Sequence, residues 1–272
     1  MKSKLLELDK KYLSTLRKLV VVGDLHGDYA SLRSVLDNFD LTKDGLIFLG
    51  DYADRGKSGV EVIEAVDALM KKHPENVFPL KGNHEDYSES GYPKFSPCHL
   101  IGEASGKIGN WQSYFENKLK PFIKSLYLGV IVRDEALFVH GGISSKIECL
   151  NNLEHPTADV ETDILWSDPF EGNGEYPNHN RGIGVMFGKD ITMKVCERLG
   201  VKKIIRSHEP QKVRCTGGPC YSHDQRVITT STTSVYGGQP FILSINPRDF
   251  SFKSYRIGKN SLIKSKIVDC SW

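Results

Sequence analysis

The sequence lacks any long hydrophobic run. None of its 272 residues belongs to a stretch approaching the roughly 20 consecutive apolar residues that a membrane-spanning helix requires. The first 22 residues are interrupted by charged side chains too often to contain the apolar region of a signal peptide. We therefore expect a cytoplasmic protein with no membrane partner.

A large excess of charge of either sign is also absent. The chain has 36 Lys and Arg residues against 34 Asp and Glu residues, a formal net charge of +2. Such a balance produces no global field that would attract nucleic acid or anionic lipid. We expect no nucleic-acid partner, and any attraction for phosphate must be local. Nothing in the composition indicates the oligomeric state.

Cysteine is sparse, with six residues scattered along a chain that is too long to need a disulfide framework. Cys215 and Cys220 bracket a turn-like Thr-Gly-Gly-Pro segment. We expect two ordinary thiols there; a hairpin disulfide, or a metal clip that includes His223, is the alternative. The histidines His155, His179 and His223 lie outside the motifs described below and are expected to be solvated.

The N-terminal half alternates strand and helix signals. Apolar runs at 19–22, 46–49 and 77–80 predict buried strands, and helical spacing at 32–39 and from Ser58 to about 70 predicts the helices between them. This order favours parallel strands joined by right-handed crossovers. Each strand runs into Gly followed by Asp or Asn, at the edge where open α/β sheets bind ligands. We expect the functional site at the carboxyl ends of these strands.

The C-terminal half carries more strand signals than helix signals. Strands are predicted at 126–132, 136–140, 203–206, 226–230, 241–245 and 250–255, and one helix is predicted between an N-cap at Asp190 and a C-cap at Gly200. We therefore expect a second sheet packed on the first, which makes an α/β fold with a central β-sandwich of two mixed sheets flanked by helices. One domain spans 1–272. Segments 85–110 and 171–180 lack periodicity and are predicted to be surface loops near the site.

Carboxylate, imidazole and amide groups gather at the predicted strand ends. A mixed oxygen and nitrogen set suits Mn, Fe, Zn or Co, and it lacks the thiolates of structural zinc sites. Any one of these groups alone is weak evidence, because Gly-Asp is often only a turn and a lone histidine is more often a core or surface residue. Their joint occurrence predicts a divalent-metal site, whose candidate ligands are Asp24, His26, Asp51, Asn83, His140 and His208.

At this point the sequence resembles the phosphoprotein phosphatase family, the metal-dependent serine/threonine phosphatases within the calcineurin-like metallophosphoesterase superfamily. The resemblance runs from about residue 19 to about residue 245. It implies the αββα architecture of that superfamily and hydrolysis of phosphoserine and phosphothreonine in proteins. Seven motifs carry it in the family's order: GDLHG (23–27), GDYADRG (50–56), GNHE (82–85), HGG (140–142), LWSDP (165–169), RGIGVMFG (181–188) and RSHE (206–209).

The resemblance also implies two divalent ions per chain, with Mn expected first and Fe, Zn or Co as alternatives. A water or hydroxide held by both ions would attack phosphorus in line, the displacement that a two-metal clamp promotes. The implied division places one ion on Asp24 and His26, the other on Asn83, His140 and His208, and Asp51 between them.

Further groups are implied for the phosphate and the leaving oxygen. His84 would protonate the leaving oxygen and Asp54 would orient it, because an alkoxide leaves poorly unless a positioned imidazolium supplies a proton. Forked guanidinium groups suit phosphoryl oxygens. Two alternatives are open: Arg181 could instead cap a loop, and Asp54 could pair with Arg55. The implied substrate contacts are Arg55, Asn83, Arg181 and Tyr236.

The sequence departs from the family at two places. Asp86-Tyr87 stands where eukaryotic members carry Ser-Arg, and 229–236 replaces a SAPNY segment, with Tyr236 corresponding to the tyrosine of that segment. These differences leave substrate preference open and, with the short C-terminal end, indicate a compact prokaryote-like member. Within LWSDP, Trp166 and Asp168 could pack behind the site or touch the substrate.

Two other functions compete with a protein phosphatase. One is hydrolysis of small phosphorylated molecules such as dinucleoside tetraphosphates, which LWSDP and RGIGVMFG disfavour. The other is a non-catalytic metal-binding scaffold, which we would expect to have lost a ligand or the acid, whereas this chain keeps every one of them.

Overall fold

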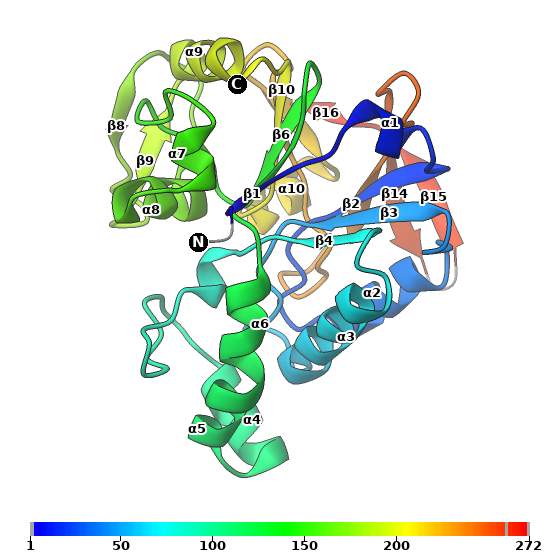
Figure 1. The fold of residues 1–272 in the computed structure, drawn as a ribbon, viewed down its shortest axis with the longest axis vertical. Helices are drawn as coiled ribbons and strands as arrows, with labels where there is room; N and C mark the ends of the chain where they lie inside the picture. Colours follow the sequence, from blue (N-terminus) through cyan, green and yellow to red (C-terminus); the bar gives the residue numbers. More distant parts are fainter. Residues whose placement is uncertain (1–2, 259–260, 271–272) are drawn as a thin grey trace.

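The computed structural model describes residues 3–258 and 261–270, and its two large sheets pack face to face (Figure 1). The first sheet has six strands in the order β15-β14-β13-β2-β3-β4. Their bounds are β2 (Lys18–Val22), β3 (Asp44–Phe48), β4 (Val77–Pro79), β13 (Phe241–Ile245), β14 (Phe252–Gly258) and β15 (Ser261–Ser265).

The first half of the chain forms the predicted parallel unit. β2 pairs with β3 and β3 with β4, both in parallel, and the connections contain α2 (Tyr29–Leu36) and α3 (Gly59–Lys72). Both helices bury one apolar face, with Val35 on α2 and Val66 on α3 at 0% exposure. The strand ends of this unit therefore point to one edge, which confirms the βαβαβ prediction.

The second sheet has seven strands in the order β1-β5-β6-β10-β12-β11-β16. Its strands are β1 (Leu5–Glu7), β5 (Gly129–Val132), β6 (Ala136–Val139), β10 (Lys203–Arg206), β11 (Cys220–Ser222), β12 (Val227–Thr229) and β16 (Val268–Asp269). A small third sheet is built from β7 (Asp168–Pro169), β8 (Glu175–Pro177) and β9 (Val185–Phe187).

The assignment of all C-terminal strands to the second sheet is wrong in one respect. β13 pairs antiparallel with β2, with Leu243 opposite Val21, and it carries β14 and β15 into the first sheet. The apolar runs show that these segments are buried strands, but the choice of pairing partner depends on contacts far apart in the chain.

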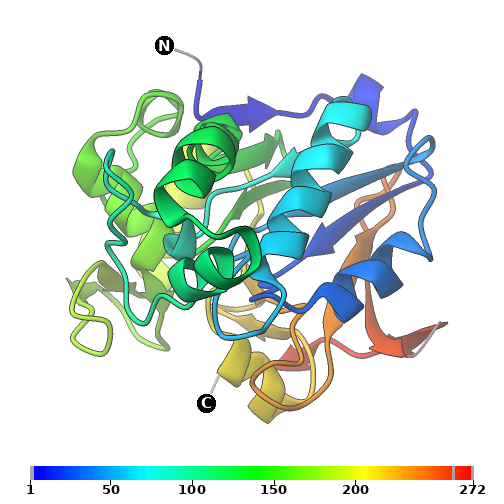
Figure 2. The same ribbon diagram turned by 90° about the horizontal axis from the view of Figure 1, so that it is seen from below.

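Apolar residues from both sheets fill the interface between them. Val21 and Ile47 of the first sheet share one core cluster with Phe138, Ile205 and Ile228 of the second. The outer face of the first sheet packs under α2 and α3, and that of the second under α8 (Ala158–Trp166) and α9 (Lys189–Leu199). Figure 2 shows these layers from a second direction. The predicted sandwich flanked by helices is confirmed.

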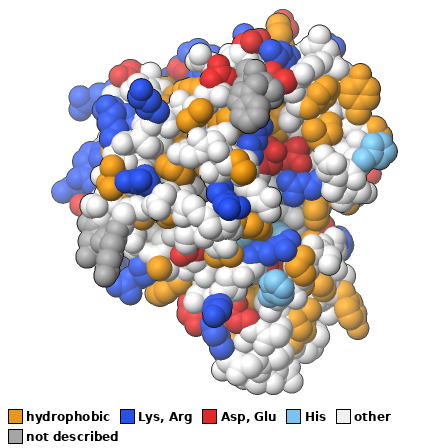
Figure 3. Space-filling view, turned by 180° about the vertical axis from the view of Figure 1, so that it is seen from behind, with side chains coloured by type: hydrophobic (Ala, Val, Ile, Leu, Met, Phe, Trp, Pro, Cys, Tyr) orange, Lys and Arg blue, Asp and Glu red, His pale blue; other side chains and the backbone are white. Residues whose placement is uncertain are grey.

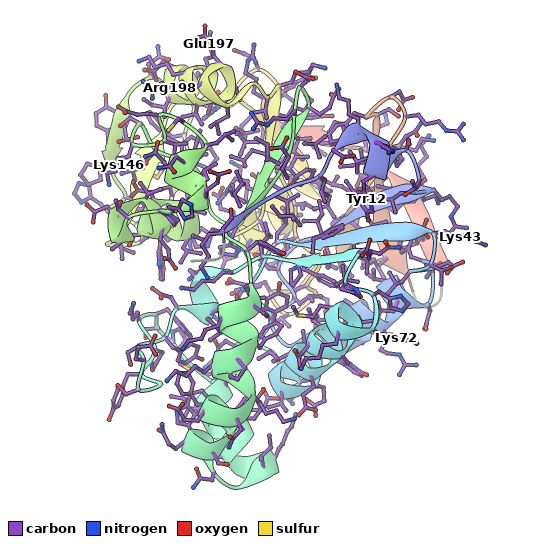
Figure 4. The ribbon with its side chains drawn as sticks, viewed as in Figure 1. Tyr12, Lys43, Lys72, Lys146, Glu197 and Arg198 are labelled. Atoms are coloured by element: carbon purple, nitrogen blue, oxygen red, sulfur yellow. The ribbon has the colours of Figure 1, made fainter. Side chains whose placement is uncertain are left out.

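Shorter helices lie in the connections between these elements. They are α1 (Lys10–Leu13), α7 (Asn151–Glu154) and α10 (Pro210–Thr216). Figure 4 shows Lys146 and Arg198 on the side of the molecule that carries α7 and α9. There the Arg198 guanidinium donates to the backbone carbonyls of Ser145 (3.2 Å) and Ile147 (3.3 Å), which ties α9 to the segment after β6.

A helical lobe projects at the bottom of Figure 1. It consists of α4 (Leu100–Ile108), α5 (Trp111–Tyr114), a π-helical turn (Phe115–Leu119) and α6 (Lys120–Ser125). The prediction of a loop over 85–110 is therefore wrong across α4, where Leu100 and Ala104 alone are buried and give too narrow an apolar stripe. The prediction of a loop over 171–180 is wrong across β8.

Two predicted local features also need correction. Helix α9 begins at Lys189 with Gly188 as its N-cap, and the carboxylate of Asp190 accepts the Gly174 N–H at 2.6 Å instead. His223 was expected in solvent but is buried. Its Nε2 donates to the Phe170 carbonyl (2.9 Å) and its Nδ1 accepts from Thr192 (2.7 Å), so both ring nitrogens are hydrogen-bonded.

Gly200 ends α9 at a φ of 64°, as predicted. All six cysteines, each within the described residues, are free thiols. Within residues 3–258 and 261–270, no helix combines the length and the apolar character needed to cross a bilayer.

Candidate metal centre and phosphate site

The six predicted ligands converge at the carboxyl ends of five strands. Two of them follow β2, and one each follows β3, β4, β6 and β10. Their exposed fractions do not exceed 3%, so the cluster lies below the surface of the cavity described below. In chain order they are Asp24, His26, Asp51, Asn83, His140 and His208.

Asp51 lies at the centre of the cluster. Its Oδ2 is 3.4 Å from Nε2 of His26, and its Oδ1 is 3.4 Å from Nε2 of His140. On the other side, His140 Nε2 lies 2.9 Å from Oδ1 of Asn83 and 3.1 Å from Nδ1 of His208. Two groups with metal-binding geometry therefore share the Asp51 carboxylate, one towards His26 and one towards His140 and His208.

The donor atoms fit divalent cations. The side-chain oxygen of Asn83 faces acceptor atoms of Asp51, His140 and His208, which is repulsive unless a cation lies among them or the amide is turned round. Among the described residues, the buried Oδ2 of Asp24 has no hydrogen-bond partner. Burial, and then the charge of Asp24, raises the pKa of Asp51 well above its usual value. A cation would offset each of these costs.

The histidines are arranged to present unprotonated nitrogen atoms. Nδ1 of His26 lies 3.0 Å from the Ala53 carbonyl, and Nδ1 of His140 lies 2.8 Å from the Leu49 carbonyl. A carbonyl accepts the ring proton at Nδ1, so Nε2 keeps its lone pair. Burial lowers the pKa of both imidazoles to about 3 and that of His208 well below its usual value. Neutral imidazole is the form that binds a metal.

Five residues of the predicted site have left-handed backbone conformations. A positive φ costs a residue other than glycine about 1–3 kcal/mol, and such strain gathers at functional sites. Neighbouring contacts must therefore hold these loops in place. The residues and their φ values are His26 (45°), Asp51 (54°), Asp54 (68°), Arg55 (68°) and His208 (71°).

Glu85 holds two of the loops together. Its carboxylate accepts the backbone N–H groups of Asp51 (2.9 Å), Tyr52 (3.0 Å) and Gly82 (2.9 Å). The two loops approach so closely that a Cβ on Gly82 would lie 2.3 Å from Oδ1 of Asp51. Sequence reasoning gave Glu85 no role, although its position in the GNHE motif was a signal.

His84 and Asp54 lie in contact beside this cluster. His84 Nδ1 is 2.8 Å from Oδ2 of Asp54, whose Oδ1 accepts the backbone N–H groups of His99 (2.5 Å) and Leu100 (2.8 Å). Burial alone would raise the pKa of Asp54, but these hydrogen bonds outweigh it and the pKa is lowered. The ring of Phe95 packs 4.5 Å from that of His84. His84 also falls within the metal-binding group around His26 and Asp51.

Asp168 anchors two arginines behind the cavity. Arg181 donates from Nε to Oδ2 of Asp168 (2.8 Å) and from Nη2 to the His208 carbonyl (3.0 Å). The fully buried Arg206 donates to Oδ1 of the same carboxylate (2.8 Å). Trp166 packs against the His208 ring at 5.9 Å. The importance of Arg206 was missed, although it opens the RSHE motif.

A cavity of about 430 Å³ lies beside the metal-ligand cluster and the two arginines. Tyr236 stands at its edge, with Oη 3.4 Å from His26 Nε2, and burial raises the pKa of this phenol to about 12. On the molecular face opposite to that of Figure 1, side chains of both charges are interspersed with hydrophobic ones (Figure 3). The cavity is lined by His26, Asp51, Arg55, Asn83, His84, Asp168, Asn180, Arg181, His208, Glu209, Pro210, Gln211, Lys212 and Tyr236.

Known proteins resemble this chain in sequence and in structure. Serine/threonine-protein phosphatase PP1-delta of Caenorhabditis elegans is 29% identical over 234 residues, which covers 81% of this chain and 72% of the relative. A protein phosphatase 2A catalytic subunit of Dictyostelium discoideum is 29% identical over 268 residues, covering 92% and 81%. A Saccharomyces cerevisiae serine/threonine phosphatase with similarity to human PP5 superposes with a TM-score of 0.75 at 25% identity, covering 98% and 84%.

Residues 17–212 match the calcineurin-like phosphoesterase family, a range that contains every predicted metal ligand. Because this match covers most of the chain and agrees with the observed fold and donor set, the chain belongs to the calcineurin-like phosphoesterase family.

Proposed function

We propose that this protein hydrolyses phosphoserine and phosphothreonine esters in proteins, with two divalent ions per chain. The observation that carries the proposal is the convergence of buried acceptor atoms around Asp51 at the floor of a cavity that also contains Arg55 and Arg181. Support for a protein substrate comes from the sequence relatives, which are named protein phosphatases, one of them a serine/threonine-protein phosphatase.

The proposed metal ligands divide into two sets that share one carboxylate. When bound, the ions would supply Lewis-acid activation of water and neutralise charge on the phosphoryl group. Mn is the metal that the family resemblance favours, and a mixed set of oxygen and imidazole donors can also hold Fe, Zn or Co. One set is Asp24, His26 and Asp51, and the other is Asp51, Asn83, His140 and His208.

The chain's own groups position the phosphate and the leaving oxygen. Arg55 and Arg181, which is held by Asp168, both line the cavity and would bind phosphoryl oxygens, assisted by the Asn83 amide and the Tyr236 phenol. His84 would donate a proton from Nε2 to the leaving oxygen while Asp54 holds Nδ1.

A substrate comparison tests the proposal. With Mn²⁺ added, we expect kcat/KM to be higher for phosphoseryl and phosphothreonyl peptides than for dinucleoside tetraphosphates. A clear preference for the nucleotide would instead assign the enzyme to small phosphorylated molecules. An absence of turnover on every phosphoester, in protein shown to contain two metal ions, would indicate a non-catalytic scaffold.

Asp51 offers the sharpest test of the shared carboxylate. Asp51→Asn removes charge from both sets, so we expect loss of both ions in metal analysis and of nearly all activity. Asp134→Asn is the matched control, because this carboxylate is exposed and pairs with Lys10 on the surface. Loss of a single ion from the Asp51→Asn protein would argue against a bridging role.

A further inference from the structure

The first turn of α4 is interlocked with the loop that carries Asp54 and Arg55. The Asp54 carboxylate caps the helix by accepting the N–H groups of His99 (2.5 Å) and Leu100 (2.8 Å). One turn further on, Glu103 of α4 accepts the N–H groups of Gly59 (3.0 Å) and of its neighbour Val60 (2.9 Å), at the start of α3. The helical lobe and the loop of the candidate site therefore support each other.

His99 makes a contact that helix capping does not explain. It occupies the N-cap position of α4, yet its side chain makes no capping hydrogen bond. Instead, its Nδ1 accepts the backbone N–H of Arg55 at 3.1 Å. Ser, Thr, Asp or Asn would be the ordinary choice for a cap. The imidazole thus acts on Arg55, whose φ of 68° is left-handed and needs support.

The two arginines of the cavity are held in different ways. Asp168 fixes the Arg181 guanidinium through Nε at 2.8 Å. Within residues 3–258 and 261–270, no hydrogen bond from the guanidinium of Arg55 is found, and this residue is exposed. The side-chain contact that holds Arg55 is therefore made at its backbone N–H, where His99 is the acceptor.

We propose that His99 is a positioning residue for Arg55, holding its backbone so that the guanidinium meets the phosphoryl group of the substrate. This inference rests on the proposed role of Arg55 in binding phosphate. His99 accepts at Nδ1 only when the ring is neutral and its proton is on Nε2. It acts through Arg55 and touches no reacting atom.

Three substitutions at position 99 separate the accepting atom from the bulk of the ring. His99→Asn keeps an acceptor, since Oδ1 lies as many bonds from Cα as Nδ1 does. His99→Gln places the accepting oxygen one bond further from Cα, and His99→Ala removes the acceptor. With p-nitrophenyl phosphate and Mn²⁺, we expect the Ala and Gln variants to raise KM about three- to tenfold with kcat nearly unchanged, the effect of one ordinary hydrogen bond. The Asn variant should restore KM to near the wild-type value.

Inorganic phosphate provides a readout that is independent of turnover. Its competitive inhibition constant should rise with KM in the Ala and Gln variants and stay near the wild-type value in the Asn variant. An equal rise in KM in all three variants, or a fall in kcat with KM unchanged, would overturn the proposal. A general loss of folding would affect the three variants regardless of where the acceptor atom lies.

A double-mutant cycle tests whether His99 affects KM through Arg55. Arg55→Ala should raise KM, and adding His99→Ala should then change KM by less than about twofold, because coupled residues are not additive. A full additional rise in the Arg55→Ala background would overturn the positioning role of His99 alone. If Arg55→Ala left KM at the wild-type value, Arg55 would not bind phosphate. The proposed role of His99 would then be wrong as well.

Discussion

His84→Asn is the substitution that best separates the acid from the metal ligands. The Asn amide can donate to Asp54 Oδ2 from nearly the position of Nδ1, which lies 2.8 Å from that oxygen. The buried Asp54 carboxylate thus keeps a donor, and the loss of folding stability should stay below about 1 kcal/mol. What the variant removes is Nε2, the atom proposed to protonate the leaving oxygen.

The expected size of the effect depends on the leaving group. A positioned general acid contributes about 10²- to 10⁴-fold to a rate. We expect kcat on a phosphoseryl peptide to fall by that amount, because the alkoxide of serine leaves poorly without a proton. On p-nitrophenyl phosphate, whose phenolate leaves readily, the fall should be less than about tenfold, since little proton donation is needed.

The assay compares steady-state kinetics on both substrates with metal analysis of the same protein. Two ions per chain should remain in His84→Asn, as in the wild type. The structure allows another outcome, because His84 lies within one metal-binding group with His26 and Asp51. Loss of an ion would make His84 a ligand. An equal fall on both substrates would refute its role as an acid.

Three further predictions concern the groups around the cavity. Asp54→Asn should lower the free energy of unfolding by about 1–3 kcal/mol. The pKa of Asp54 is lowered in the folded protein, so the difference in unfolding free energy between wild type and variant should be complete at pH 5–8 and should disappear as the pH falls below about 4. Urea titrations with chelator present measure this difference. A difference that stayed constant at low pH would contradict the lowered pKa of Asp54. Asp168→Asn should raise KM and the inhibition constant of phosphate about tenfold, because Arg181 loses a charge-assisted anchor; unchanged constants would mean that Arg181 does not bind phosphate. Tyr236→Phe should leave two ions per chain and change KM by less than about threefold, since a 3.4 Å contact is a weak hydrogen bond; loss of an ion would make the phenol a ligand.

Much of the fold follows from local patterns. The strands before Asp24, Asp51 and Asn83 are short apolar runs, and the crossovers between them show helical spacing, so their order and parallel pairing could be predicted. Helix α4 could not, because only Leu100 and Ala104 of its nine residues are buried. The pairing of β13 with β2 joins residues more than 200 positions apart, and nothing in either segment specifies the partner.

The start of α9 shows how a long-range contact overrides a good local signal. Asp190 is a favourable N-cap by residue type, yet its carboxylate binds the Gly174 N–H and the helix begins two residues earlier than a cap at Asp190 would place it. His223 was expected in solvent, but Phe170 and Thr192 each bind one of its ring nitrogens. In both cases the deciding partner lies more than 15 residues away.

The sequence by itself determined which donor groups stand at the strand ends, because residue type and turn chemistry are local properties. Only the tertiary structure decided which atoms face one another. Asp24 accepts the His208 N–H across 184 positions of the chain, and His99 reaches Arg55 across 44. These contacts depend on how two sheets and a helical lobe pack together, and no short segment encodes that packing.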